Sequence, residues 1–334
     1  MKKKIVFLIP YFGKFPNYFQ LFLNSCKNNY DYDWIIITDN QEKYNYPENV
    51  KIINKNFKEL KEEIQKKFDF KIWLENPYKF CDYRPAYGYV FEYLIKDYEY
   101  WGYCDVDLIF GEIKNFITEE LLNKYDKIFI NGHMSIYKNT KENNKMFMKK
   151  LNNKEIYKKY FTDRQNYAFD ELWNNSINDI YLENGVEIYD KKLCADVYPR
   201  NADFRLVLGY SRDYCEEFLE KKKRSIFYYK NGKIFRYYKK EDLLLKNEYI
   251  YLHLQKRKMV LNFKEENSYL IIPNQFIPWN SEMTIEEYKK LSKRRLDFNW
   301  IVQYFYGRKQ VFLDFLSESL PIKIKNILKI IVKK

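Results

Sequence analysis

The chain has 334 residues, of which 59 are Lys or Arg and 46 are Asp or Glu, so its formal charge at pH 7 is +13. Aromatic residues make up 20%, which excludes a low-complexity disordered chain, and no apolar run reaches the roughly 18 residues of a membrane span. The five cysteines are scattered without a Cys-x-x-Cys pair, and His133 and His253 are the only histidines, which excludes a disulfide framework and a His-rich metal centre.

The N-terminal part of the chain alternates between short apolar runs and amphipathic segments. We predict buried strands over 4–9, 34–38 and 50–53, and helices over 15–27 and 57–68. This β-α-β order predicts an α/β layer with a mostly parallel sheet. Ligands bind such sheets beyond the carboxyl ends of the strands. Candidates for a nucleotide edge, with ordinary loop residues as the alternative, are Pro10, Tyr11, Phe12, Thr38 and Asp39.

The middle of the chain adds a predicted helix over 91–95 and a buried strand over 127–130. A stretch rich in Lys and Asn, residues 139–159, is typical of a solvated helix. The Asn-Gly pair at 231–232 lies between two aromatic runs and predicts a hairpin over 226–238.

The C-terminal part contains one more predicted strand, over 249–254, and the pattern becomes helical beyond Pro278. We expect a catalytic domain over 1–260 and a helical C-terminal extension over 261–334. Residues 321–334 alternate Ile, Leu and Val with Lys and contain no acid. As a helix, this tail would have an apolar face flanked by lysines, as in helices that lie on a membrane surface; a helix packed on a partner or on the core is the alternative.

The sharpest motif is Asp105-Val106-Asp107. Two carboxylates at i and i+2 lie on the same side of a strand, and at a strand end they can hold a hard divalent cation. The motif lies between apolar segments, where two unpaired acids are costly without a cation or another partner. Structural acids paired with arginine or backbone groups are the alternative.

These features together resemble the GT-A fold of nucleotide-sugar glycosyltransferases: strand, helix, strand ending in Asp, and a distant Asp-x-Asp after an Arg-containing helix. Residues 81–111 are also similar to an uncharacterised bacterial family from surface-polysaccharide gene clusters, with its Cys-Asp-x-Lys/Arg-Pro-Ala-x-Gly block followed by Cys-Asp-x-Asp-Leu-x-x-Gly. Residues 132–133 and 253–256 resemble segments of the same family. The resemblance covers about residues 1 to 260 and implies an α/β, GT-A-like (Rossmann-like) mixed and mostly parallel sheet flanked by helices.

The resemblance implies a metal site. In GT-A enzymes the Asp-x-Asp motif binds Mn²⁺ or Mg²⁺, which bridges the donor's two phosphates and helps the nucleoside diphosphate to leave. Carried over, Asp105 would contact the ribose or the metal, and Asp107 and His253 would be metal ligands. Lys256 or Arg257 would then bind phosphate. Taken alone, His253 would be a satisfied core histidine.

Three more residues are candidates for binding the donor or the acceptor. Asp82 and Arg84 resemble a pair that positions the nucleotide and the donor sugar, although their spacing is one residue shorter than in the toxin-like relatives. An ordinary ion pair is the alternative. His133 follows a strand and a glycine, where it either binds a donor or acceptor hydroxyl or packs in a loop.

Asp170 and Glu171 follow the aromatic residues of segment 167–169. In inverting GT-A enzymes, a carboxylate at about this distance after the acidic motif deprotonates the acceptor hydroxyl. Asp170 is the first candidate for this catalytic base and Glu171 is the second. In a retaining enzyme the same acid would bind the acceptor or donor sugar; solvated helix acids are the remaining alternative.

We therefore expect a metal-dependent glycosyltransferase of the hexosyltransferase type. It would move a sugar from a nucleotide donor, a UDP-sugar by preference, to a capsule, lipopolysaccharide or other surface glycan acceptor that is lipid-linked. Residues 5–10 end without a signal-peptide cleavage site, so we expect a cytoplasmic enzyme, peripheral on the inner face of the cytoplasmic membrane.

The basic excess has three explanations: a nucleic-acid partner, the composition of an A- and T-rich genome, and attraction to anionic lipid or a phosphate-bearing substrate. No nucleic-acid-binding module is recognisable, so we expect no nucleic-acid partner. The rival enzyme class is a nucleotidyltransferase, for which residues 10–14 make a poor phosphate loop. The rival without catalysis is a carbohydrate- or nucleic-acid-binding protein.

Overall fold

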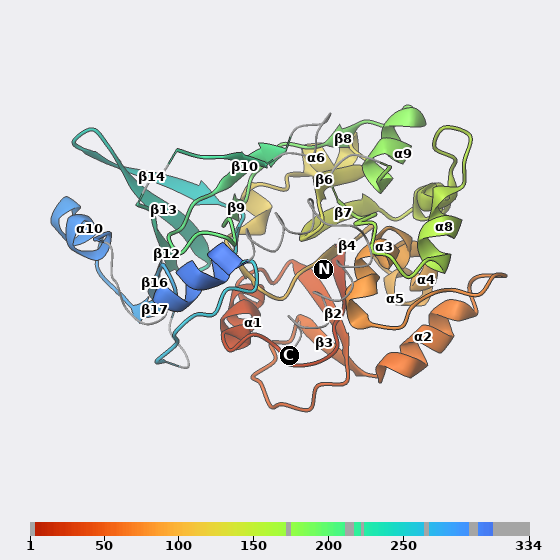
Figure 1. Ribbon diagram of the computed structural model, residues 1–334, viewed down its shortest axis with the longest axis horizontal. Helices are drawn as coiled ribbons and strands as arrows, with labels where there is room; N and C mark the ends of the chain where they lie inside the picture. Colours follow the sequence, from red (N-terminus) through yellow and green to blue (C-terminus); the bar gives the residue numbers. More distant parts are fainter. Residues whose placement is uncertain are drawn as a thin grey trace.

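A computed structural model of the protein describes residues 4–171, 175–210, 217–221, 224–263, 267–293 and 300–309. Its centre is a seven-stranded sheet with the strand order β3-β2-β1-β4-β7-β6-β8 (Figure 1). The strands are β1 (Ile5–Pro10), β2 (Tyr32–Thr38), β3 (Val50–Asn54), β4 (Tyr100–Cys104), β6 (Lys127–Asn131), β7 (Met134–Lys138) and β8 (Ile188–Tyr189). Only β7 runs antiparallel to its neighbours, so the predicted mostly parallel α/β sheet is confirmed.

Successive residues of β1 point to opposite faces of the sheet, and both faces are covered. Val6 and Leu8 pack on one face with α2 (Phe57–Gln65), which begins in a capping box between Asn56 and Glu59. Phe7 and Ile9 pack on the other face with α1 (Phe19–Lys27). The remaining helices around this sheet are α3 (Phe80–Tyr83), α4 (Tyr87–Val90), α5 (Glu92–Ile95), α6 (Glu119–Lys124), α7 (Lys141–Asn144), α8 (Ile156–Thr162) and α9 (Ile177–Glu183).

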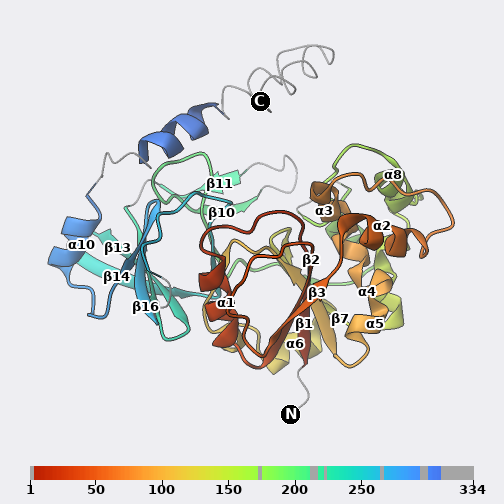
Figure 2. The same cartoon turned by 90° about the horizontal axis from the view of Figure 1, so that it is seen from below.

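A second, antiparallel sheet lies on the far side of α1 (Figure 2). Its strand order is β14-β13-β12-β16-β17, and the Asn231-Gly232 turn joins β12 to β13 with both residues at positive φ, which confirms the predicted hairpin. Helix α1 contacts both sheets, with Phe22 facing the first and Leu21 facing the second. The strands are β12 (Ile226–Lys230), β13 (Lys233–Lys240), β14 (Leu243–Tyr249), β16 (Ser268–Ile272) and β17 (Gln275–Pro278).

The helical extension expected from residue 261 begins later in the chain. Residues 268–278 form β16, which pairs with β12, and β17, which pairs with β16. The second sheet therefore contains strands from both sides of residue 260. The first helix beyond this sheet is α10 (Ile285–Leu291), and residues 300–309 are also helical. Among the described residues, no helix combines the length and the apolar character that crossing a bilayer requires. The tail over 321–334 lies outside the described residues.

The single solvated helix expected over 139–159 is wrong. This segment contains α7, a 3-10 turn over Met146–Met148 and the start of α8, separated by a tight turn in which Asn152 and Asn153 both have positive φ. Asparagine tolerates this left-handed conformation. Phe147 is fully buried, and its ring packs against Phe161. Aromatic burial thus outweighs the polar composition of the segment.

Two small sheets complete the fold. One pairs β10 (Val207–Tyr210) with β11 (Glu217–Leu219). The other has the order β5-β15-β9 and joins β5 (Leu108–Phe110) to β15 (Tyr251–His253) and β9 (Ala195–Asp196). Because β15 lies between the other two strands, segments far apart in the sequence meet directly beyond the end of β4.

Candidate active site

A cavity of about 650 Å³ opens at the carboxyl ends of β1 and β4. This is where an α/β sheet is expected to bind its ligand. The sequence-predicted residues that line it are Pro10, Tyr11, Phe12, Arg84, Asp105, Asp107, His133, Asp170, Glu171, His253 and Lys256. Four predicted residues, Thr38, Asp39, Asp82 and Arg257, do not line the cavity.

The acidic motif forms the turn between β4 and β5. Backbone hydrogen bonds hold it at both ends: the N–H of Asp105 donates to the carbonyl of His133 at 3.0 Å, and the N–H of Leu254 donates to the carbonyl of Asp107 at 3.1 Å. The N–H of Lys256 also donates to Oδ2 of Asp107 at 2.5 Å. The turn is therefore anchored to the segment that follows β15.

His253 faces both carboxylates of the motif. Its Nε2 lies 3.5 Å from Oδ1 of Asp107 and 3.8 Å from Oδ2 of Asp105. Burial disfavours the charged imidazole, but Asp107 and Asp196 raise the pKa of His253 to about 10. Burial likewise opposes the charge on Asp107, whose pKa is nevertheless lowered by His253 and by the N–H of Lys256. The sequence-predicted set of Asp105, Asp107 and His253 is thus brought together.

These three residues fit a divalent cation. Oδ1 of Asp107 is buried and has no hydrogen-bond partner among the described residues, so one ligand oxygen is available. The ligand atoms of Asp105, Asp107 and His253 all lie within 4.8 Å of one another. Two carboxylates with one imidazole suit Mn²⁺, and the carboxylates alone suit Mg²⁺. The cavity lining carries four carboxyl groups against the basic side chains of Arg84, Lys256 and His253, so its acidic groups outnumber its basic ones without counting the neutral His133.

Asp196 is a residue of the site that sequence reasoning missed. It is fully buried on β9, where its backbone is in register with His253, and its Oδ1 lies 2.9 Å from Nδ1 of that histidine. Although burial opposes its charge, His133, His253 and Lys192 hold the pKa of Asp196 well below its usual range. No motif surrounds Asp196 in the sequence, and only the pairing of β9 with β15 reveals it.

His133 also lies beside Asp196, and its ring centroid is 4.4 Å from that of His253. Its Nδ1 is 2.9 Å from the hydroxyl of Tyr251, and its Nε2 is buried, 3.8 Å from Oδ2 of Asp196. Burial and the neighbouring His253 lower the pKa of His133 well below its usual value. His133, Asp196 and His253 form a second possible ligand set, but it shares His253 with the first, and the ammonium of Lys192 lies 3.1 Å from Oδ2 of Asp196. The set containing the acidic motif is therefore the better cation site.

Arg84 links the acidic motif to the predicted catalytic acids. Its guanidinium donates to Oδ1 of Asp105, to the carbonyl of Gly132 and, at 2.8 Å, to Oδ2 of Asp170. It also lies over the ring of Tyr103, with 5.1 Å between Cζ and the ring centroid. Burial opposes this charge, but Asp105 and Asp170 raise the pKa of Arg84. Arg84 is thus ion-paired with Asp105 and Asp170 and not with Asp82, and it is part of the cavity wall.

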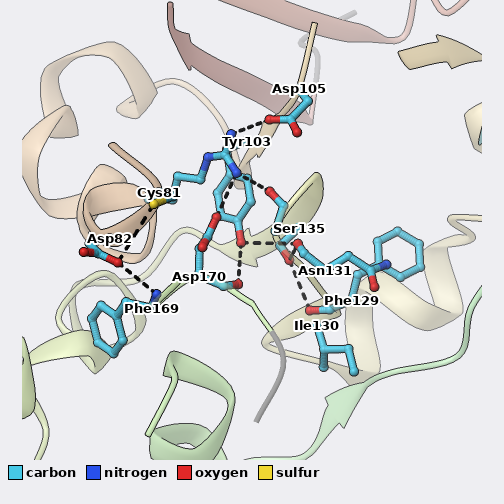
Figure 3. Close-up of polar contacts among 12 residues, drawn as sticks. Cys81, Asp82, Tyr103, Asp105, Phe129, Ile130, Asn131, Ser135, Phe169 and Asp170 are labelled. Carbon is cyan, nitrogen blue, oxygen red and sulfur yellow. Dashed lines mark hydrogen bonds and ion pairs between the residues drawn. The ribbon is translucent and has the colours of Figure 1, made fainter. Parts of the chain in front are cut away.

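Asp170 and Glu171 differ in exposure and in partners. Asp170 is 1% exposed, and its backbone carbonyl accepts from the hydroxyl of Tyr103 at 3.0 Å (Figure 3). Glu171 is partly exposed, and its carboxylate makes no hydrogen bond or ion pair with another described residue; a Cβ on Gly132 would lie 2.5 Å from its Oε2. Burial raises the pKa of both carboxyls, well above its usual value in Asp170. Glu171 is therefore the less engaged of the two acids.

Asp82 has a structural role instead of the expected contact with a nucleotide. Its side chain is fully buried and forms an ion pair with the buried Lys79, with 2.7 Å between Nζ and Oδ2. Its carboxylate also accepts from the backbone N–H of Tyr167 and, at 3.1 Å, from that of Phe169, of which Figure 3 shows the second contact. Asp82 thus holds the segment that carries Asp170, and it does so from behind the cavity wall.

The end of β2, where Thr38 and Asp39 were expected to bind a nucleotide, is also arranged differently. Thr38 is fully buried, and its Oγ1 accepts from the N–H of Asn40 at 3.1 Å. Asp39 is exposed and accepts from the N–H of Gly13 at 3.2 Å, so it supports the loop that follows β1. Both residues lie outside the cavity lining, so of the predicted nucleotide-edge residues Pro10, Tyr11 and Phe12 line the cavity.

The two basic residues after His253, Lys256 and Arg257, lie in different surroundings. Lys256 is exposed at the rim, with its Nζ 5.2 Å from the ring centroid of Tyr78. Arg257 is buried and donates to the backbone carbonyls of residues 198, 201 and 202, so it is unavailable for phosphate. Tyr78, which sequence reasoning missed, is 64% exposed and lines the cavity. Exposed aromatic rings of this kind stack on sugars and bases.

Comparison with known proteins places this arrangement in a family. No curated protein matches the chain at a significant level. Residues 7–280 match DUF6625, which is described as a family of unknown function. The matched region extends from β1 to the residues just after β17 and includes every residue of the cavity discussed above. Since the match spans most of the sequence, the chain belongs to the DUF6625 family.

Proposed function

We propose that this protein is a metal-dependent glycosyltransferase that transfers a sugar from a nucleotide donor, a UDP-sugar by preference, to an acceptor hydroxyl. One observation carries the proposal: the Asp105-Val106-Asp107 turn and the buried His253 converge on a single cavity at the carboxyl edge of a mostly parallel sheet. The resemblance of residues 1–260 to GT-A enzymes supports the same reaction class. The Mg²⁺ or Mn²⁺ ion would be held by Asp105, Asp107 and His253.

The residues of the cavity suit a nucleotide diphosphate donor. A divalent cation, when bound, supplies Lewis-acid stabilisation of the departing diphosphate. Lys256 is exposed at the rim and adds a positive charge that suits the same phosphates. Tyr11 and Phe12 follow β1 at the nucleotide edge, where their rings offer surfaces for the base. Arg84 is occupied by Asp105 and Asp170, and we propose that it holds the acidic turn against the cavity wall.

Glu171 is the better placed of the two candidates for the base that receives the proton of the acceptor hydroxyl. Asp170 is nearly inaccessible and its Oδ2 accepts from Arg84, so its main effect is on the position of Arg84. Glu171 lines the cavity, and burial raises its pKa, which makes its carboxylate a stronger base. His133, whose imidazole is buried, supports the site through Tyr251 and Asp196.

The acceptor remains as expected from the resemblance: we propose a lipid-linked surface glycan presented at the cytoplasmic membrane. The charge of +13 supports contact with anionic lipid. The helix over 300–309 adds exposed apolar side chains, with Phe305 63% and Tyr306 52% exposed. Aromatic side chains of this kind insert into the membrane interface.

A screen of nucleotide-sugar donors with Mn²⁺ tests the proposal, with release of the nucleoside diphosphate as the readout. Asp107→Ala should abolish the metal-dependent release while the circular dichroism spectrum and Tm stay near those of the wild type. Asp242→Ala, which removes a fully exposed carboxylate on the far sheet, is the matched control and should keep full activity. Full activity in Asp107→Ala would refute the assignment, and release of pyrophosphate in place of UDP or GDP would identify a nucleotidyltransferase.

A further inference from the structure

The imidazole of His253 is held from behind by Asp196. The two residues face each other across the parallel pair of β9 and β15, and the 2.9 Å contact between Oδ1 and Nδ1 lies on the side of the ring away from the acidic motif. A carboxylate can only accept at this position, so Nδ1 must carry the hydrogen. The other ring nitrogen, Nε2, is then directed at Asp105 and Asp107.

Asp196 is itself held in place by several contacts. Its side chain is fully buried, Nε2 of Gln255 donates to Oδ1 at 2.9 Å, and Nζ of Lys192 lies 3.1 Å from Oδ2. Lys192 precedes β9 and Gln255 follows β15, and the carboxylate of Asp196 cannot turn without breaking its contacts with both. The orientation of the His253 ring is therefore set by a carboxylate that does not line the cavity.

We infer that Asp196 is a positioning residue that orients His253 as a nitrogen ligand and makes the site prefer Mn²⁺ to Mg²⁺. This inference rests on the metal site of the proposed function. Imidazole is a good ligand for Mn²⁺, whereas Mg²⁺ takes oxygen ligands and gains little from a histidine. A carboxylate behind a metal-binding histidine fixes its tautomer and raises its basicity, and its removal costs about 10- to 100-fold in metal affinity.

The test is a titration of the full chain with Mn²⁺ alone and with Mg²⁺ alone, with no donor present. Asp196→Asn keeps the size of the side chain but weakens the acceptor. We expect the Kd for Mn²⁺ to rise about 10- to 100-fold and the Kd for Mg²⁺ to change less, so that the preference for Mn²⁺ falls. Gln255→Asn is a second variant, because asparagine tolerates the positive φ of this position but is too short to reach Asp196. It should lower the preference for Mn²⁺ over Mg²⁺ by a smaller factor than Asp196→Asn does.

Glu220→Gln is the matched control. Glu220 is another buried carboxylate, which pairs with Arg236 in the second sheet, so its loss should lower stability without changing the ratio of the two Kd values. An unchanged ratio in Asp196→Asn and Gln255→Asn, or an equal loss of both metals, would overturn the inference. A wild-type protein that binds Mn²⁺ with the expected preference but releases no nucleotide from any donor would refute the glycosyltransferase proposal alone.

Discussion

Lys127 and Lys79 are two fully buried lysines with opposite electrostatic surroundings. Lys79 forms an ion pair with Asp82, whereas Lys127 has no ion pair with a described residue and donates to the carbonyl of Phe129 in the bulge of β6. Burial lowers the pKa of Lys127 to about 7 from 10.5. In the unfolded chain the side chain regains its ordinary value, so folding between these pH values releases a proton.

The size and the sign of the effect of Lys127 on stability follow from the difference between its folded and unfolded pKa values. Each unit of pKa corresponds to about 1.4 kcal/mol, so the buried ammonium costs on the order of 5 kcal/mol at a pH near 7 or below. Because the folded pKa is depressed, the unfolded state binds more protons between about pH 7 and 10.5, and stability rises with pH over that window. Lys127→Met removes the cost together with two hydrogen bonds, to the carbonyl of Phe129 and to Oγ of Ser135, worth about 2 kcal/mol in total. The carbonyl of Phe129 keeps Ser135 as a donor at 3.2 Å.

We therefore expect Lys127→Met to raise the free energy of unfolding by about 3 kcal/mol near pH 7, measured by urea denaturation. The gain should shrink by about 1.4 kcal/mol per pH unit between about pH 8 and pH 10. The free energy of unfolding of the wild type is subtracted from that of the variant at each pH, because the contribution of tyrosine titrations then cancels. Lys79→Met should act in the opposite direction and destabilise by about 3 to 5 kcal/mol, since it leaves Asp82 buried without its partner. A gain that is independent of pH, or a loss of stability in Lys127→Met, would refute the reasoning.

Three further predictions concern function. Glu171→Gln should lower glycosyl transfer by about 10²- to 10⁴-fold with an unchanged Tm, whereas Asp170→Asn should mainly lower the Tm by weakening the contact with Arg84; the reverse pattern would make Asp170 the base. Gly132→Ala should reduce turnover without loss of metal binding, because the new Cβ meets the Glu171 carboxylate. Unaltered kinetics in this variant would show that Glu171 can move freely. Deleting residues 321–334 should reduce binding to anionic liposomes steeply at low salt, by about 1 kcal/mol per lysine, while donor hydrolysis persists; equal liposome binding by the truncated chain would leave the tail a packing element.

Local pattern in the sequence was sufficient for much of the architecture. The apolar runs of β1 and β2, the amphipathic α1 and the Asn231-Gly232 hairpin were all predictable, because their signals lie within a few consecutive residues. The spacing of Asp105 and Asp107 was equally local, and their place beyond a buried strand indicated a ligand edge. By contrast, the break of segment 139–159 depends on Phe147, whose burial is decided by Phe161 and other distant residues.

The tertiary structure alone decided which groups surround the acidic motif. Asp196 reaches His253 only because β9 and β15 are neighbours in register, and Arg84 and Asp82 occupy opposite sides of the cavity wall although two positions separate them. Neither fact follows from spacing in the chain, since strand pairing and side-chain burial are properties of contacts between distant segments. The sequence by itself therefore determined the fold class and the position of the acidic motif, and the packing of distant strands determined the orientation, partners and accessibility of the residues around it.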